Sequence, residues 1–161
     1  MHANEAEIDA ALVRRLLAAQ FPQWAGLPLA PVESAGTDNA IYRLGDDLAV
    51  RLPRIPRVVP QAEKEHRWLP LLARHLPLAI PQPLAKGVPA EGYPWPWSVD
   101  RWIEGETGVE RIRDSRDAAV ALAGFIAALR RIDPAGGPLP GEHNFFRGVP
   151  LAERDARVRA S

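Results

Sequence analysis

The apolar positions near the start of the chain repeat with a helical spacing. Residues three and four apart lie on the same side of a helix, so this spacing predicts a helix with one apolar side. That side consists of Ile8, Leu12, Val13, Leu16 and Leu17. Pro22 follows and predicts the end of the helix, because proline has no backbone N–H to continue it.

Between Leu29 and Pro53 the pattern changes to short apolar runs separated by residues that favour turns. The predicted strands are Leu29–Ser34, Ala40–Leu44 and Leu48–Leu52. Glycine, aspartate and asparagine dominate both connections, at 36–39 and at 45–47. Short strands joined by tight turns predict a three-stranded antiparallel meander.

The next segment alternates again between helical and extended patterns. A helix is predicted over Gln61–His75, with Pro70 either kinking it or restarting it. Two further strands are predicted at Leu84–Gly87 and Trp97–Ile103. We therefore predict an α+β fold with a five-stranded antiparallel sheet and packed helices.

After Gly105 the pattern of apolar residues becomes helical, and a helix is predicted over Ser115–Asp133. Its expected buried stripe is Leu122, Phe125, Ile126, Leu129 and Ile132. A loop over 138–150 and the start of another helix over 151–161 follow. The pattern predicts one lobe over residues 1–103, then a linker and the beginning of a helical second lobe over 104–161.

Composition and charge exclude several classes of protein. Lys+Arg and Asp+Glu both number 20, so the net charge is zero, which argues against nucleic-acid and membrane partners. The chain has no cysteine, so disulfides and thiol catalysis are excluded. No leader segment is recognised and no apolar run approaches the ~18 residues needed to span a bilayer. A cytoplasmic protein is expected.

The candidate chemistry lies in four segments. They are a polar turn at Ser34–Asn39, the strand residues AVRL at 49–52, the helix residues EKEH at 63–66 and the sequence SVDRWIEGE at 98–106. With the helix QAEKEHRWLPLL and the segment GYPWPWS at 92–98, and in this order, they resemble the N-lobe of the aminoglycoside phosphotransferase family, which has a protein-kinase-like fold.

The resemblance implies a small-molecule kinase that transfers the γ-phosphate of ATP, with Mg²⁺, to a hydroxyl of its substrate. Arg51 would bind phosphate in place of the lysine that most kinases carry, and Glu65 would orient it. The backbone of Arg101, Trp102 and Ile103 (the hinge segment) would bind adenine. The phosphates would be covered by the turn that contains Ser34, Gly36, Thr37, Asp38 and Asn39.

The catalytic loop of that family, His-Gly-Asp with a later asparagine, is not found in these 161 residues. None of His2, His66, His75 and His143 is followed two residues on by aspartate. The sequence therefore predicts no catalytic and no metal-binding residues of its own, and this chain alone is expected to be inactive. A non-catalytic module that binds nucleotide, or a partner through the helix at 115–133, is the alternative.

Simpler interpretations remain open at each site. Arg51 and Glu65 also fit an ordinary surface ion pair, and such pairs contribute little to the stability of a protein. The turn at 34–39 also fits an ordinary hairpin connection. The acceptor substrate is not indicated by this segment of sequence.

Overall fold

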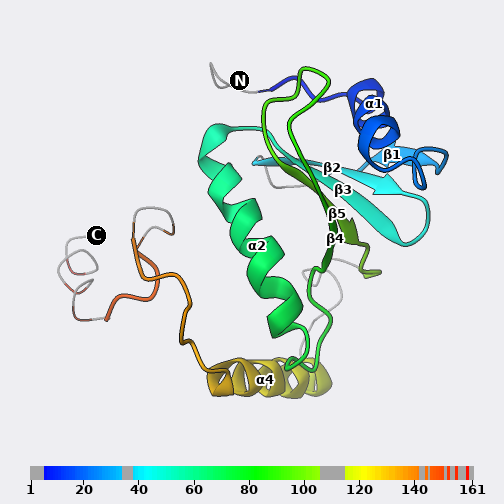
Figure 1. The fold of residues 1–161 in the computed structure, drawn as a ribbon. Helices are drawn as coiled ribbons and strands as arrows, with labels where there is room; N and C mark the ends of the chain where they lie inside the picture. The colour runs from blue at the N-terminus through cyan, green and yellow to red at the C-terminus, as the bar shows by residue number, and fades with distance from the viewer. Residues whose placement is uncertain are drawn as a thin grey trace.

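The structure is a computed structural model that describes residues 6–33, 38–105, 115–141, 144, 146–150, 152, 155 and 159. Figure 1 shows a twisted sheet with a helix on each side and a third helix beyond them. The helices are α1 (Ala10–Gln20), α2 (Val59–Leu72) and α4 (Arg116–Arg131), with a short 3₁₀ turn η1 (Pro56–Val58) before α2. The strands are β1 (Leu29–Pro31), β2 (Asn39–Leu44), β3 (Leu48–Pro53), β4 (Pro83–Gly87) and β5 (Trp97–Arg101).

All five strands form one antiparallel sheet in the order β1-β2-β3-β5-β4. The predicted meander of the first three strands is confirmed, with Leu44 opposite Leu48 across the tightest turn. Gly45 begins that turn with a φ of 59°, a left-handed conformation that glycine adopts without steric cost. β5 inserts between β3 and β4, which brings residues far apart in sequence into register.

One face of the sheet is apolar and packs against α1. Alternate residues of a strand point to opposite faces, so every second residue of β2, β3 and β5 faces this helix. The buried core consists of Leu12, Val13, Leu16, Leu17, Ala40, Tyr42, Leu44, Val50, Leu52, Tyr93, Trp97 and Val99. The helical pattern predicted for the start of the chain is therefore the pattern that builds the core.

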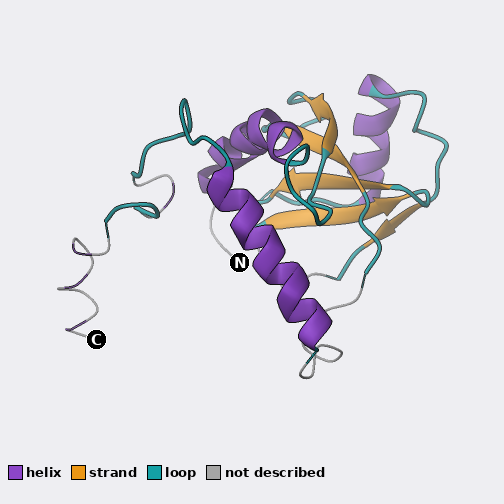
Figure 2. Ribbon diagram, turned by 90° about the horizontal axis from the view of Figure 1, so that it is seen from below, coloured by secondary structure: helices purple, strands orange, loops and turns teal. Residues whose placement is uncertain are grey.

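Helix α2 lies on the other side of the sheet from α1 (Figure 1; Figure 2 shows the same arrangement from below), next to β4 and to the polar residues Arg51, Ser98 and Asp100. Two ion pairs tie this helix to the sheet: Glu65 to Arg51 of β3, and Glu63 to Lys86 of β4. None of the residues of α2 is fully buried, and Pro70 lies within the helix two residues before its end. The prediction of a helix here is confirmed, and Pro70 falls in its last turn.

Helix α4 begins at Ser115, whose hydroxyl accepts a hydrogen bond from the N–H of Ala118 at 3.2 Å, as an N-cap does. The stripe expected to be buried is instead largely exposed, and only Ala128 of this helix is buried. Its exposed members include Leu122, Ile126 and Leu129. The expectation of a buried stripe was wrong for these three residues, because α4 has few contacts with the other described helices and strands.

The helix predicted over 151–161 falls mostly outside the described residues. Within the described part of the chain, no helix has the length and apolarity required to cross a membrane.

Candidate functional site

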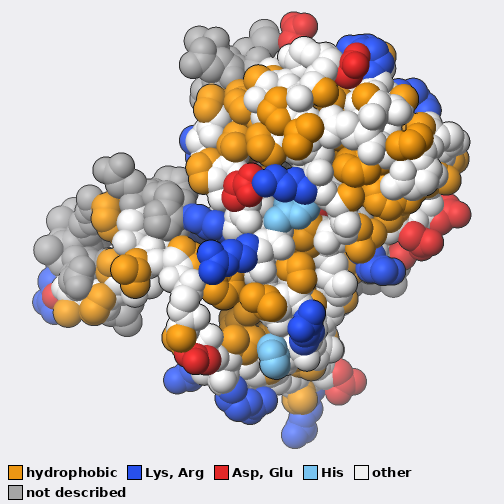
Figure 3. All heavy atoms as spheres, in the orientation of Figure 1, with side chains coloured by type: hydrophobic (Ala, Val, Ile, Leu, Met, Phe, Trp, Pro, Cys, Tyr) orange, Lys and Arg blue, Asp and Glu red, His pale blue; other side chains and the backbone are white. Residues whose placement is uncertain are grey.

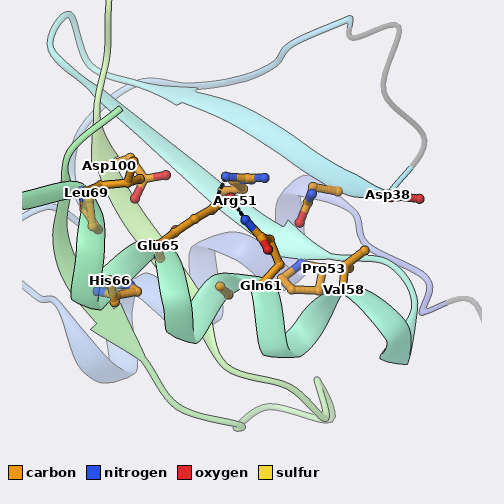
Figure 4. A pocket seen from close by; sticks show the side chains of 13 residues that line it. Asp38, Arg51, Pro53, Val58, Gln61, Glu65, His66, Leu69 and Asp100 are labelled. Atoms are coloured by element: carbon orange, nitrogen blue, oxygen red, sulfur yellow. Dashed lines mark hydrogen bonds and ion pairs between the residues drawn. The ribbon is translucent and has the colours of Figure 1, made fainter. Parts of the chain in front are cut away.

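Arg51 and Glu65 form the centre of the polar side of the sheet. Arg51 lies in β3 between Ile41 of β2 and Ser98 of β5. Its Nη1 donates to Oε2 of Glu65 at 2.5 Å, and Gln61, one turn earlier in α2, donates to the other carboxylate oxygen at 3.1 Å. Figure 4 shows both bonds. The predicted pairing of strand cation and helix carboxylate is present.

A small pocket of about 100 Å³ lies between this ion pair, α2 and β5. Its polar lining comes from Asp38, Asn39, Arg51, Gln61, Glu65, His66, Ser98 and Asp100. Figure 4 places Asp100 and Asp38 on opposite sides of Arg51 in that view. Near α2, Figure 3 shows acidic, basic and histidine side chains lying close together among apolar and uncharged atoms.

A larger cleft of about 350 Å³ adjoins the small pocket at Arg51. The cleft is lined by Asp38, Asn39, Ile41, Ala49, Arg51, Pro81, Asp100, Arg101, Trp102 and Ile103. The predicted phosphate-binding cation and all three residues of the predicted hinge segment therefore line one cavity. Apolar Ile41 and Ala49 lie beside polar groups in this lining, so the cleft combines apolar surface with a few polar groups, as small-molecule sites do.

The predicted turn is only partly described. Ser34, Gly36 and Thr37 lie outside the described residues, so their predicted role remains a prediction. Asp38 and Asn39 line both cavities. The carboxylate of Asp38 also accepts a hydrogen bond from Arg57 at 2.7 Å, which anchors this end of the turn beside η1.

The hinge segment is held by backbone hydrogen bonds. The N–H of Arg101 donates to the carbonyl of Gln82 at 2.8 Å, and the N–H of Trp102 donates to the carbonyl of Asp47 at 2.7 Å. The amide protons of Arg101 and Trp102 are thus used by the fold.

Two titratable groups beside the ion pair have pKa values shifted by burial. Burial raises the pKa of Asp100 above its ordinary value, although the hydroxyl of Ser98 and the cation of Arg51 act in the opposite direction. Burial also lowers the pKa of His66, against the influence of Asp100. The Nε2 atom of His66 is buried without a hydrogen-bond partner. Both groups are therefore disfavoured in their charged forms.

Three residues of this site lie within the candidate segments, but no role was predicted for them from the sequence: His66, Ser98 and Asp100. Ser98 and Asp100 alternate with the apolar Trp97 and Val99, a pattern of period two that indicates a polar face. That alternation was the available signal for Asp100. The position of His66 in the pocket had no comparable signal, because it depends on how α2 is oriented against the sheet.

The comparisons with known proteins agree with this geometry. A sequence profile described as the phosphotransferase enzyme family matches residues 30–161. The chain belongs to this family. A comparison with curated protein sequences found no match.

Solved structures of aminoglycoside phosphotransferases share the fold of this family member. The GDP complex of aminoglycoside 2'-phosphotransferase-IIIa is 22% identical with a TM-score of 0.68 and aligns with 78% of this chain and 43% of its own. A GDP and kanamycin complex of APH(2")-IIIa is 23% identical with a TM-score of 0.65, over 75% and 42%. The ADP-bound APH(2'')-Ib is 18% identical with a TM-score of 0.55, over 78% and 41%.

These likenesses confirm the predicted fold class, a protein-kinase-like α+β fold with a five-stranded antiparallel sheet. This chain spans less than half of the length of each of these three structures. Among the described residues, no group of three or more histidine or acidic side chains is arranged to hold a metal ion. Because Mg²⁺ in such enzymes is held by one or two carboxylates together with substrate phosphates, this leaves the Mg²⁺ of the family reaction a prediction.

Proposed function

We propose that the cleft binds the nucleoside triphosphate of a small-molecule kinase. The observation that carries this proposal is the Arg51–Glu65 bond of 2.5 Å at the edge of a cleft whose far lining is the hinge segment. A fixed cation at one end and the backbone of the hinge segment at the other match the phosphates and the base of one ligand.

Each residue has a distinct role in this proposal. Arg51 contacts the phosphates through its guanidinium fork, and Glu65 keeps that fork turned toward the cleft. The carbonyl of Arg101 and the N–H of Ile103 bind the edge of the base. The segment that ends in Asp38 and Asn39 covers the phosphates.

The reaction of the whole enzyme is transfer of the γ-phosphoryl group to a hydroxyl of a small molecule. The hydroxyl oxygen bonds to the γ-phosphorus, the bond to the bridging oxygen breaks, and the hydroxyl proton passes to a base. Such transfers depend mainly on positioning and charge stabilisation, which a fixed Arg51 supplies. Magnesium and a catalytic base belong to the family reaction, and the 161 residues include no His-x-Asp triplet to supply that base.

A second candidate is nucleotide binding without catalysis by these 161 residues, which contain no His-x-Asp triplet. The two are distinguished by a phosphoryl-transfer assay with ATP, magnesium and kanamycin. Binding of ATP without formation of ADP supports the non-catalytic role, whereas turnover excludes it.

Calorimetric titration with ATP tests the proposed cleft. We expect Arg51→Ala to raise the Kd by about tenfold or more, since a charge-assisted contact of about 1.5–3 kcal/mol is lost. The control is Arg15→Ala. Arg15 lies on α1, and its substitution removes an exposed ion pair with Glu91. Equal affinity in wild type and Arg51→Ala, with both folded, contradicts the assignment.

A further inference from the structure

Arg43 connects two segments that the chain keeps far apart. Its Nε donates to the carbonyl of Gly45 at 3.2 Å, and its Nη2 donates to the carbonyl of Asp46 in the same β2–β3 turn. The same Nη2 bonds to the carboxylate of Glu104 at 2.5 Å. Its guanidinium carbon lies 4.2 Å from the centre of the Trp102 ring. One side chain thereby holds the turn of a hairpin against the hinge segment.

A backbone bond reinforces this connection. The N–H of Trp102 donates to the carbonyl of Asp47 at 2.7 Å, next to the turn that Arg43 contacts. The side chain of Arg43 is 26% exposed, whereas that of Glu104 is 77% exposed, so the cation is the shielded member of the pair. A guanidinium that is partly buried and stacked on an aromatic ring contributes more interaction free energy than a solvent-exposed ion pair does.

We propose that Arg43 is a positioning residue for nucleotide binding. It fixes Trp102 and, through it, the neighbouring backbone of Arg101 and Ile103 that faces the cleft. Arg43 lies outside the described lining of that cleft, so it acts through the hinge segment and does not touch the nucleotide. The proposal rests on the proposed function for the identity of the ligand.

The chemistry of arginine explains why this residue suits the task. Its fork donates in several directions from one plane, and the same plane stacks on the ring of Trp102. Lysine keeps the charge but not the fork, so it can reach Glu104 or the turn but cannot replace all the contacts. Arg43→Lys is therefore a graded variant that keeps the charge and most of the side-chain bulk.

The experiment combines amide hydrogen exchange with calorimetric titration by ADP, on the whole chain. In Arg43→Met we expect faster exchange over residues 101–104, with the melting temperature close to that of wild type. The Kd of Arg43→Met for ADP should rise about tenfold, as expected from the loss of the cation–π contact and the hydrogen bonds of Arg43. The Kd of Arg43→Lys should lie between those of wild type and Arg43→Met. Arg15→Met is the control, and we expect no change in either measurement.

Two outcomes overturn the proposal in distinguishable ways. If wild type binds ADP and Arg43→Met leaves either the exchange or the Kd unchanged, Arg43 does not position the hinge segment and the proposed function stands. If Arg43→Met loses its fold, Arg43→Lys decides by the same two measurements. If wild type itself binds no ADP at millimolar concentration, the proposed function fails and the role of Arg43 in nucleotide binding fails with it.

Discussion

Arg51 and Glu65 are 14 residues apart in the chain, yet Nη1 of one lies 2.5 Å from Oε2 of the other. The bond joins the centre of β3 to the second turn of α2 and crosses the polar side of the sheet. Their side chains are 29% and 22% exposed, so the pair is partly sheltered from solvent. An ion pair in that position sets the direction of the guanidinium at the edge of the cleft.

Removing the charge of Glu65 tests whether it orients Arg51. We expect Glu65→Gln to raise the Kd for ADP by about threefold, less than Arg51→Ala, because the phosphate contact itself remains. Glu63→Gln is the matched control, since Glu63 lies on the same helix as Glu65 and pairs with Lys86 of β4. Calorimetry on both variants measures the difference. An equal effect of the two substitutions would show that Glu65 has no special role.

Asp100 makes stability depend on pH. Burial raises its pKa above the ordinary value of 3.8, so the folded state binds this proton more tightly than the unfolded state. The free energy of unfolding therefore falls as pH rises through the pKa of Asp100 in the folded state, and it stays lower at neutral pH. We expect Asp100→Asn to melt a few degrees higher than wild type at about pH 7, with the difference shrinking below about pH 4.

Thermal melting across that range of pH checks the prediction for Asp100. The control is Asp47→Asn, an exposed turn residue that bonds to Trp102 through its carbonyl rather than its carboxylate. A gain for Asp100→Asn that is the same at every pH contradicts the assignment to this titration.

Position 87 must be glycine because the ring of Trp97 leaves no space for a side chain there. The two residues are opposite each other in β4 and β5, and a Cβ at position 87 would overlap the indole ring. Trp97 is only 1% exposed, so its ring has no room to move. We expect Gly87→Ala to lower the free energy of unfolding by about 1–3 kcal/mol, as overpacking of a core does.

Denaturation by urea measures this loss. Gly26→Ala is the control, because nothing lies within 4 Å of a Cβ built there. We expect this control to change stability by less than about 1 kcal/mol. A similar small effect at Gly87 would mean that β4 shifts easily away from Trp97.

Much of the fold was predictable because it follows from local patterns. The spacing of Leu12 and Leu16 predicts α1, and the turn at Gly45 predicts the β2–β3 hairpin, since both depend on neighbouring residues alone. Arg51 and Glu65 were predicted from family resemblance, and the structure places them in contact. The roles in nucleotide binding of Arg51, Glu65 and the hinge segment remain predictions.

The sequence by itself determined the helices, the strands and the alternation that separates the apolar face of the sheet from its polar face, because backbone geometry sets these periods over a few residues. Only the tertiary structure decided that β5 lies between β3 and β4, which brings Ser98 opposite Arg51 and Asp100 into the same pocket. It also decided that Arg43 stacks on Trp102 and that the stripe of α4 is exposed. Such contacts join residues distant in sequence, and no local period encodes them.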